Sequence, residues 1–221
     1  MENSKGYKGV GMEGFVARLY NVNARRYNAG LYRAWAHNLA DQIETGSKVL
    51  EIAPGPGYLA IELVKRRNCT VVALEISKTF LSIAQANARE AGVTIDFRHG
   101  NVAAMPFDEN EFDFLICTSS FKNFDEPLKA LNEMFRVLKP GGKVWISDLR
   151  RDISDNAIDE FVSRSMKAKG LAGIFMKRTF KSTLRPRAYT SGQFKDLVSG
   201  TEFGACSIKE NMIDFEASLQ K

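Results

Sequence analysis

The sequence has few of the residues that build disulfides and metal centres. Its 221 residues include three cysteines and two histidines, and no Cys-x-x-Cys pair occurs. We therefore expect Cys69, Cys117 and Cys206 to be reduced core residues that form no disulfide and bind no metal. With so few histidines, a metal site would need carboxylates that have other roles, so none is predicted.

Long hydrophobic runs are absent as well. No stretch of about 18 apolar residues occurs, so no transmembrane helix is predicted. Residues 1–14 are polar and rich in glycine, without the apolar core of a secretion signal, which favours a cytoplasmic protein. The chain is long enough for one α/β domain with decorations and a substantial core.

What the sequence does contain is an alternation of β-like and α-like segments. Ser77 and Asp125 suit helix N-caps, and Gly92 a helix end. The alternation predicts an α/β fold, a doubly wound, Rossmann-like sheet of seven mostly parallel strands with an antiparallel C-terminal hairpin. Strands are expected near 47–53, 69–75, 94–98, 112–118, 142–148, 203–209 and 212–218, and helices near 57–67, 78–91 and 125–138.

The segment 49–57 combines the end of a strand, a glycine turn and the start of a helix. Its apolar run ends at Glu51, and a Pro/Gly turn through Gly55 and Gly57 follows. Glycine allows the backbone to approach a ligand closely. Glu75 ends the next apolar strand, where a carboxylate can accept both hydroxyls of a ribose. The two strand ends together predict a nucleoside site.

The details of this turn favour a cationic nucleoside over a dinucleotide. A pyrophosphate site would need a third glycine, where this chain has Ala60 and Ile61. Glu51 would repel a pyrophosphate but can accept a hydrogen bond from an ammonium group. A nicotinamide-dependent dehydrogenase is therefore disfavoured.

Five motifs in order resemble the class I S-adenosylmethionine-dependent methyltransferases of the small-molecule type. They occupy residues 51–57, 74–75, 100–107, 112–117 and 131–142. The resemblance is close over 45–150 and implies S-adenosyl-L-methionine as cofactor. It divides the chain into an N-terminal helical cap (1–44), a cofactor-binding core (45–150), a basic lid (151–200) and a C-terminal hairpin (201–221).

The same resemblance implies the cofactor contacts. Two positions depart from the family pattern, because Ala53 replaces its first glycine and Asn101 replaces its usual Asp. We expect a mildly reshaped turn at Ala53, and the Asn101 amide oxygen can still accept from the adenine amino group. The implied contacts are Tyr20, Glu51, Ala53, Pro54, Gly55, Gly57, Glu75, Ile76, Asn101, Val102, Thr118 and Ser119.

Residues 13–40 place aromatic and aliphatic side chains three and four apart, which predicts one or two amphipathic helices. In the resembling enzymes such helices cap the cofactor, so Tyr20 or Tyr27 would reach its methionine end or the acceptor. Packing within an aromatic face is the alternative for either tyrosine. His37 is a candidate base, with an exposed helix histidine as the alternative.

Residues 150–187 are strongly basic. They contain ten Lys and Arg but four acids, while the whole chain has a net charge of +5. Such an asymmetry can attract an anionic substrate, a nucleic acid or a membrane surface, and a solvated lid is the simpler interpretation. Aromatic residues that could stack on bases are sparse here, so RNA binding is the minor alternative.

The segment after the fourth predicted strand supplies the candidate acceptor site. Ser120, Lys122 and Asn123 should line it, without the motif that amine-directed nucleic-acid and glutamine methyltransferases carry here. Asp148 and Tyr189 are candidates for acceptor contact or general base, and a capping role for Asp148 stays open.

Methyl transfer from a sulfonium is an in-line displacement, so positioning and desolvation can supply most of the catalysis. The sequence therefore predicts a methyltransferase that acts on O, N or C of a small molecule. An RNA methyltransferase using the basic segment and a non-catalytic cofactor-binding protein are the alternatives.

Overall fold

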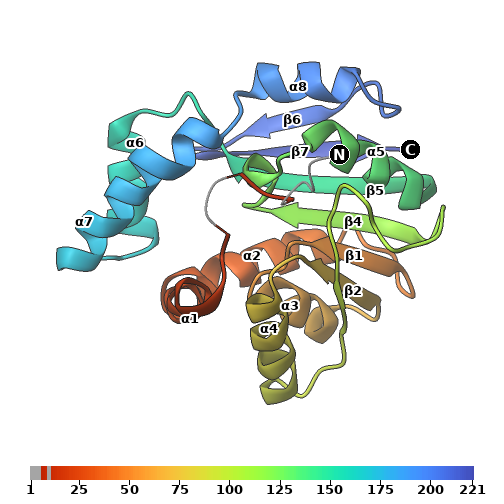
Figure 1. Ribbon diagram of the computed structural model, residues 1–221, viewed down its shortest axis with the longest axis horizontal. Helices are drawn as coiled ribbons and strands as arrows, with labels where there is room; N and C mark the ends of the chain where they lie inside the picture. Colours follow the sequence, from red (N-terminus) through yellow and green to blue (C-terminus); the bar gives the residue numbers. More distant parts are fainter. Residues whose placement is uncertain (1–5, 9–10) are drawn as a thin grey trace.

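The computed structural model describes residues 6–8 and 11–221 (Figure 1). Eight α-helices and seven strands occur within these residues, with short 3-10 and π-helical turns between some of them. In chain order they are α1 (Gly14–Asn23), α2 (Ala29–Ala40), β1 (Lys48–Ile52), α3 (Tyr58–Arg66), β2 (Thr70–Glu75), α4 (Lys78–Glu90), β3 (Asp96–His99), β4 (Phe112–Thr118), α5 (Pro127–Val137), β5 (Leu138–Leu149), α6 (Asp155–Glu160), α7 (Gly170–Thr179), α8 (Ser191–Ser199), β6 (Ser207–Glu210) and β7 (Asp214–Gln220).

The strands form one sheet in the order β3-β2-β1-β4-β5-β7-β6. Neighbours pair in parallel, except that β7 runs antiparallel to both β5 and β6. This confirms the predicted doubly wound sheet with an antiparallel C-terminal hairpin. The strand order reverses between β1 and β4, and α/β sheets bind ligands in the crevice beyond the carboxyl ends of such strands.

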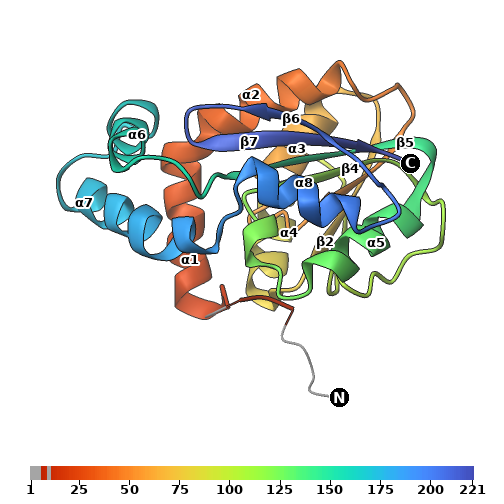
Figure 2. The same cartoon turned by 90° about the horizontal axis from the view of Figure 1, so that it is seen from above.

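Helices cover both faces of the sheet. In Figure 2 the helix α2 lies on one side of the strands and α5 and α8 on the other. Trp35 and Leu39 of α2 are buried with Leu59 of α3 on the first face, while Met134 of α5 and Phe194 of α8 are buried on the second. Residues of α2 and α8, which the sequence assigned to the cap and the lid, therefore also pack on the sheet.

Local sequence signals explain several element boundaries. The Ser77 hydroxyl accepts a hydrogen bond from the Phe80 N–H and begins α4, as predicted. Gly92, just past α4, adopts a left-handed φ of +69° that suits glycine. The predicted N-cap at Asp125 is wrong, because α5 begins at Pro127 and its cap position is Glu126. Asp125 instead accepts a hydrogen bond from the Gly6 N–H.

Two strands begin at other residues than the sequence predicted. The strand β5 begins at Leu138, before the expected start at 142, and continues through the Pro-Gly-Gly turn. The strand β6 begins only at Ser207, after the expected 203. Cys69 and Cys206 consequently precede their strands and are only partly buried, whereas Cys117 is buried; all three are free.

The segment between β5 and β6 projects from one end of the sheet. Figures 1 and 2 both show α6 and α7 beyond the strands, beside α1. Ile158 and Val162 pack there against Leu149 in a small separate core. Exposed apolar side chains remain on α1 and α7, namely Phe15, Val16, Leu19, Val22, Leu171, Ile174 and Phe175. None of the helices in the described ranges combines the length and the hydrophobicity that crossing a bilayer demands.

Candidate functional site

The turn after β1 forms the floor of the crevice. Ala53 adopts a left-handed φ of +54°, the conformation that a glycine would adopt without strain. Ala53 therefore carries the strain of this conformation, and the mildly reshaped turn stays a prediction. Gly55 has a φ of +56°, and a Cβ placed on it would meet nothing within 4 Å. The turn therefore leaves open space above its backbone.

Glu75 lies at the end of β2 beside this turn. Its Oε2 accepts a hydrogen bond from the Gly55 N–H at 3.0 Å, and its Oε1 accepts one from the Ser77 N–H at 2.8 Å. Burial raises the pKa of the Glu75 carboxyl, and the backbone hydrogen bonds from Ser77 and Gly55 only partly oppose this rise. Each oxygen keeps lone-pair capacity for a further donor, such as a ribose hydroxyl.

Glu51, at the end of β1, is the most isolated carboxyl group of the crevice. The residue is 1% exposed, and its Oε2 has no hydrogen-bond partner among the described residues. Burial raises the pKa of Glu51 to about 8, and repulsion from Glu75 adds to this shift. A cationic donor placed here would satisfy the oxygen and restore the ionised form.

Aromatic residues of the N-terminal helices close this part of the crevice. The Tyr20 ring packs edge-on against Phe80, with centroids 5.6 Å apart. Burial raises the pKa of Tyr20, a nearby Tyr32 hydroxyl opposes the shift, and the Glu75 charge adds to it. Tyr20 therefore lies near Glu75, and Tyr32 lies near Glu51. The contact of Tyr20 with the cofactor stays a prediction.

Asn101 and Val102 lie at the other end of the crevice, beyond β3. The Asn101 Oδ1 accepts a hydrogen bond from the Ala103 N–H at 3.0 Å, so this oxygen shapes its own turn. A Cβ placed on Gly6 would approach Ile76 Cδ1 to 2.3 Å and Asn101 Nδ2 to 3.0 Å. The N-terminal segment thus packs directly on the residues predicted to hold the adenine.

Residues 6–8 and 11–14, here called the strap, cross the carboxyl edge of the sheet. At one end, the Lys8 N–H donates to the Asn123 carbonyl at 2.7 Å. At the other, the Glu13 carboxylate accepts from the Lys78 and Thr79 N–H groups at 3.0 and 3.1 Å, at the start of α4. The strap therefore lies over the crevice and is bonded on both sides of it.

A buried ion pair lies at the ends of β4 and β5. Lys122 Nζ is 2.8 Å from Asp148 Oδ1 and also donates to the Ser119 carbonyl. The Lys122 and Leu149 N–H groups each donate to Asp148 at 2.7 Å. Asp148 and Lys122, predicted as base and acceptor contact, are thus bonded mainly to each other and to backbone.

Three further residues at the β4 end are strained or polar. Ser119 has a left-handed φ of +54°, and such strain is concentrated at functional sites. The Ser120 Oγ lies 3.0 Å from the Thr118 carbonyl. The Asn123 Oδ1 is buried and has no hydrogen-bond partner within the described part of the chain. This amide is available to a ligand.

Tyr189 lies near the β4 end, and two other predicted residues do not. Its ring centroid is 5.8 Å from that of Phe121, and its hydroxyl accepts a hydrogen bond from Lys8 Nζ at 3.0 Å. His37 is exposed on α2, and its neighbours Trp35 and Leu39 fill the sheet face. Tyr27 lines a separate cavity between the N-terminal helices and the projecting segment.

The carboxylates at the ends of β1 and β2 and the open turn at Gly55 would suit a nucleoside. The chain also matches known proteins. A family model described as a methyltransferase domain matches residues 50–146. Two curated relatives are ubiquinone/menaquinone biosynthesis C-methyltransferases named UbiE. The one from Allorhizobium ampelinum is 28% identical over 77% of this chain and 74% of its own, and the one from Idiomarina loihiensis is 32% identical over 70% and 64%.

A solved structure shares the fold over nearly the whole chain. It is a candidate S-adenosyl-L-methionine-dependent methyltransferase from Methanococcus maripaludis, 20% identical, with a TM-score of 0.77 over 97% of this chain and 95% of its own. The chain is a class I S-adenosylmethionine-dependent methyltransferase. S-adenosyl-L-methionine is its cofactor.

The crevice of this methyltransferase fits that cofactor. Glu51 offers a buried acceptor oxygen to an ammonium group, Glu75 offers acceptors to ribose hydroxyls, and the open turn at Gly55 admits a ligand. When bound, the cofactor supplies a methyl group on a sulfonium, which a nucleophile can attack. Glu51 and Glu75 would hold and orient the cofactor, and the strap would cover it.

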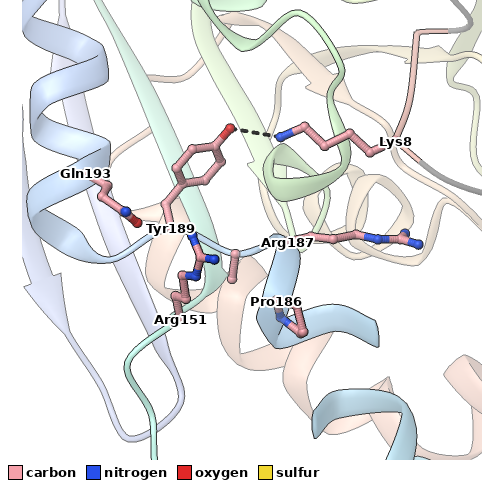
Figure 3. Close-up of a pocket in the computed structure, with 7 residues that line it drawn as sticks. Lys8, Arg151, Pro186, Arg187, Tyr189 and Gln193 are labelled. Atoms are coloured by element: carbon pink, nitrogen blue, oxygen red, sulfur yellow. Dashed lines mark hydrogen bonds between the residues drawn. The ribbon is translucent and has the colours of Figure 1, made fainter. Parts of the chain in front are cut away.

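Sequence reasoning missed several residues at the edge of this site. Lys8 and Glu13 belong to a segment that composition alone marked as a polar terminus, and only their long-range bonds show their place. Arg151 and Arg187 were counted in the basic segment, but no local pattern distinguished them from its other cations. Both line a cavity with Tyr189 (Figure 3).

Proposed function

We propose that this methyltransferase transfers the methyl group to a carbon atom of a small, electron-rich acceptor such as a phenol or an enol. The observation that carries the proposal is the similarity to curated C-methyltransferases over about three-quarters of the chain, 77% for the first relative. A phenolic or enolic carbon becomes nucleophilic when the neighbouring hydroxyl loses its proton.

The arrangement at the β4 end supports an acceptor of this kind. Tyr189 presents a hydroxyl that already accepts from Lys8, so its own proton is free to donate to an acceptor oxygen. We propose that Tyr189 contacts the acceptor and donates a hydrogen bond that stabilises the acceptor oxygen in its deprotonated form. Asp148 instead holds Lys122 and the β4 loop in place, because its oxygens are taken up by these groups.

The basic segment gives less support to RNA as acceptor. Five of its ten cations form ion pairs with acids in the described structure, so much of the local charge is neutralised. They are Arg150, Arg164, Lys177, Lys181 and Arg185. The other cations are divided between two separate cavities and the exposed side of α7.

The test uses cofactor labelled with ¹³C in its methyl group. The protein is incubated with it and with host extract separated into metabolites, lipids, RNA and protein. We expect label in the metabolite or lipid fraction, with the chemical shift of a methyl group bound to carbon. A methyl group on oxygen or nitrogen would contradict the proposed acceptor atom, and label confined to RNA would contradict the acceptor class.

A further inference from the structure

A cavity of about 410 Å³ opens beside Tyr189, at the end of the crevice. It is lined by Lys8, Arg151, Pro186, Arg187, Ala188, Tyr189 and Gln193. This volume falls within the range of small-molecule sites. Figure 3 shows Lys8 at the hydroxyl end of Tyr189, with Arg151 near the backbone end of that residue. The Arg151 N–H also donates to the Tyr189 carbonyl at 3.1 Å, which fixes this arrangement.

The lining of this cavity carries positive charge that no acidic residue of the lining neutralises. It contains three cations and no acid. Arg150 beside it is paired with Asp152 and Glu210, but the side chains of Arg151 and Arg187 form no hydrogen bond or ion pair with any described residue. An arginine side chain presents a planar set of donors that matches a carboxylate or a phosphate. The cavity is therefore suited to an anion.

Lys8 links this cavity to the cofactor crevice. Its ammonium group is in the cavity, bonded to Tyr189, while its backbone belongs to the strap and is bonded to Asn123. Two residues earlier, Gly6 packs on Ile76 and Asn101 at the adenine end of the crevice. An anion bound to Lys8 would thus hold the strap in its closed position over the cofactor.

We infer that the acceptor of this methyltransferase carries a carboxylate or phosphate group that binds in the cavity lined by Lys8, Arg151 and Arg187, and that this contact holds the strap closed over the cofactor. The inference rests on the proposed function for its acceptor. It adds that the acceptor is an anion and that its binding is coupled to that of the cofactor. Acceptor and cofactor should bind cooperatively, because each makes the closed strap more favourable.

The experiment measures binding of S-adenosylhomocysteine by calorimetry, so it needs no turnover. Titrations are made alone and with millimolar 4-hydroxybenzoate, phenyl phosphate, inorganic phosphate or the neutral 4-hydroxybenzamide. We expect at least one of the three anions to raise the affinity about fivefold or more, and the amide to leave it unchanged. The carboxylate and phosphate probes distinguish the two anionic groups.

Substitutions of the three cationic residues test whether they bind the anion. Lys8→Met, Arg151→Gln and Arg187→Gln should each remove most of the anion effect while the affinity measured without anion changes little for the two arginine variants. Arg178→Gln is the matched control, because Arg178 is an exposed cation of α7 that lines neither cavity. It should keep the full effect.

The inference is overturned if no anion changes the affinity, if the amide acts like the acid, or if the arginine variants respond like the control. Failure of the proposed function gives a different result. If an anion raises the affinity but no carbon-methylated product forms, the anion site is supported and only the proposed acceptor atom is refuted. Melting temperatures of the variants show that they fold.

Discussion

At the scale of single residues, Glu51 shows how the site is prepared for a cation. The backbone of β1 carries this carboxyl group into the interior, where burial favours its neutral form and raises its pKa to about 8, although a backbone hydrogen bond from Ala60 opposes the shift. The folded state therefore holds a proton that the unfolded chain releases near pH 4.3. The contribution of Glu51 to stability decreases as the pH rises between these values and is constant above about 8.

The substitution Glu51→Gln tests this effect. Without cofactor, the variant should melt at a higher temperature than the wild type above pH 8, because glutamine cannot ionise there. Its affinity for S-adenosylmethionine should fall about tenfold or more, since one charge-assisted hydrogen bond is lost. Thermal melts and calorimetry at several pH values measure both effects, and a lower melting temperature at high pH would refute the account.

Proton release is a second consequence at Glu51. An ammonium group beside the carboxylate lowers its pKa, so binding below about pH 8 should release a proton from wild-type protein. Calorimetry in two buffers of different ionisation enthalpy detects this release. Glu51→Gln serves as the control and should release less.

The buried pair of Lys122 and Asp148 predicts an asymmetry between two substitutions. Asp148→Ala leaves the Lys122 ammonium buried with only the Ser119 carbonyl, and should cost about 3–5 kcal/mol of stability. Lys122→Met leaves Asp148 with two backbone donors, so its cost should be smaller. Denaturant unfolding of both variants measures the difference, and equal costs would contradict the assigned bonds.

At the scale of elements, the strap is bonded to the start of α4 at several points, one of them the Glu13 side chain. Glu13 accepts two backbone N–H groups there, at the end of the helix where a negative charge is favourable. The substitution Glu13→Ala should therefore loosen the strap and speed the release of S-adenosylhomocysteine several-fold, with a stability loss of about 1 kcal/mol. Stopped-flow displacement measures the rate. Glu202→Ala, an exposed acid elsewhere, is the control and should leave the rate unchanged.

The elements also show what sequence can and cannot predict. The apolar runs that end at Glu51 and Glu75 predicted β1, β2 and the acidic pair, because buried parallel strands need continuous hydrophobic sequence. The strap had no such signal, since Gly6 and Lys8 are placed by bonds to residues more than a hundred positions away. Likewise, the pairing of Asp148 with Lys122 depends on two strand ends meeting.

At the scale of the whole molecule, charge is distributed differently from what the sequence indicates. The basic segment contains ten Lys and Arg, but its acids pair with its cations, and the rest are spread over separate surfaces. We therefore expect weak RNA binding with a shallow salt dependence, corresponding to fewer than about three phosphate contacts. Filter binding at several salt concentrations measures the slope. A steep slope with tight binding would restore the RNA methyltransferase interpretation.

We expect the crevice between β1 and β4 to hold S-adenosylmethionine through the carboxylate of Glu75. The most direct measurement is the affinity of the cofactor for wild type, Glu75→Ala and Glu75→Gln by calorimetry. Both variants should lose affinity, with about a hundredfold loss for alanine, which removes both ribose acceptors and leaves the Gly55 and Ser77 N–H groups without their partner. Unchanged affinity in folded Glu75→Ala protein would contradict the location of the cofactor site.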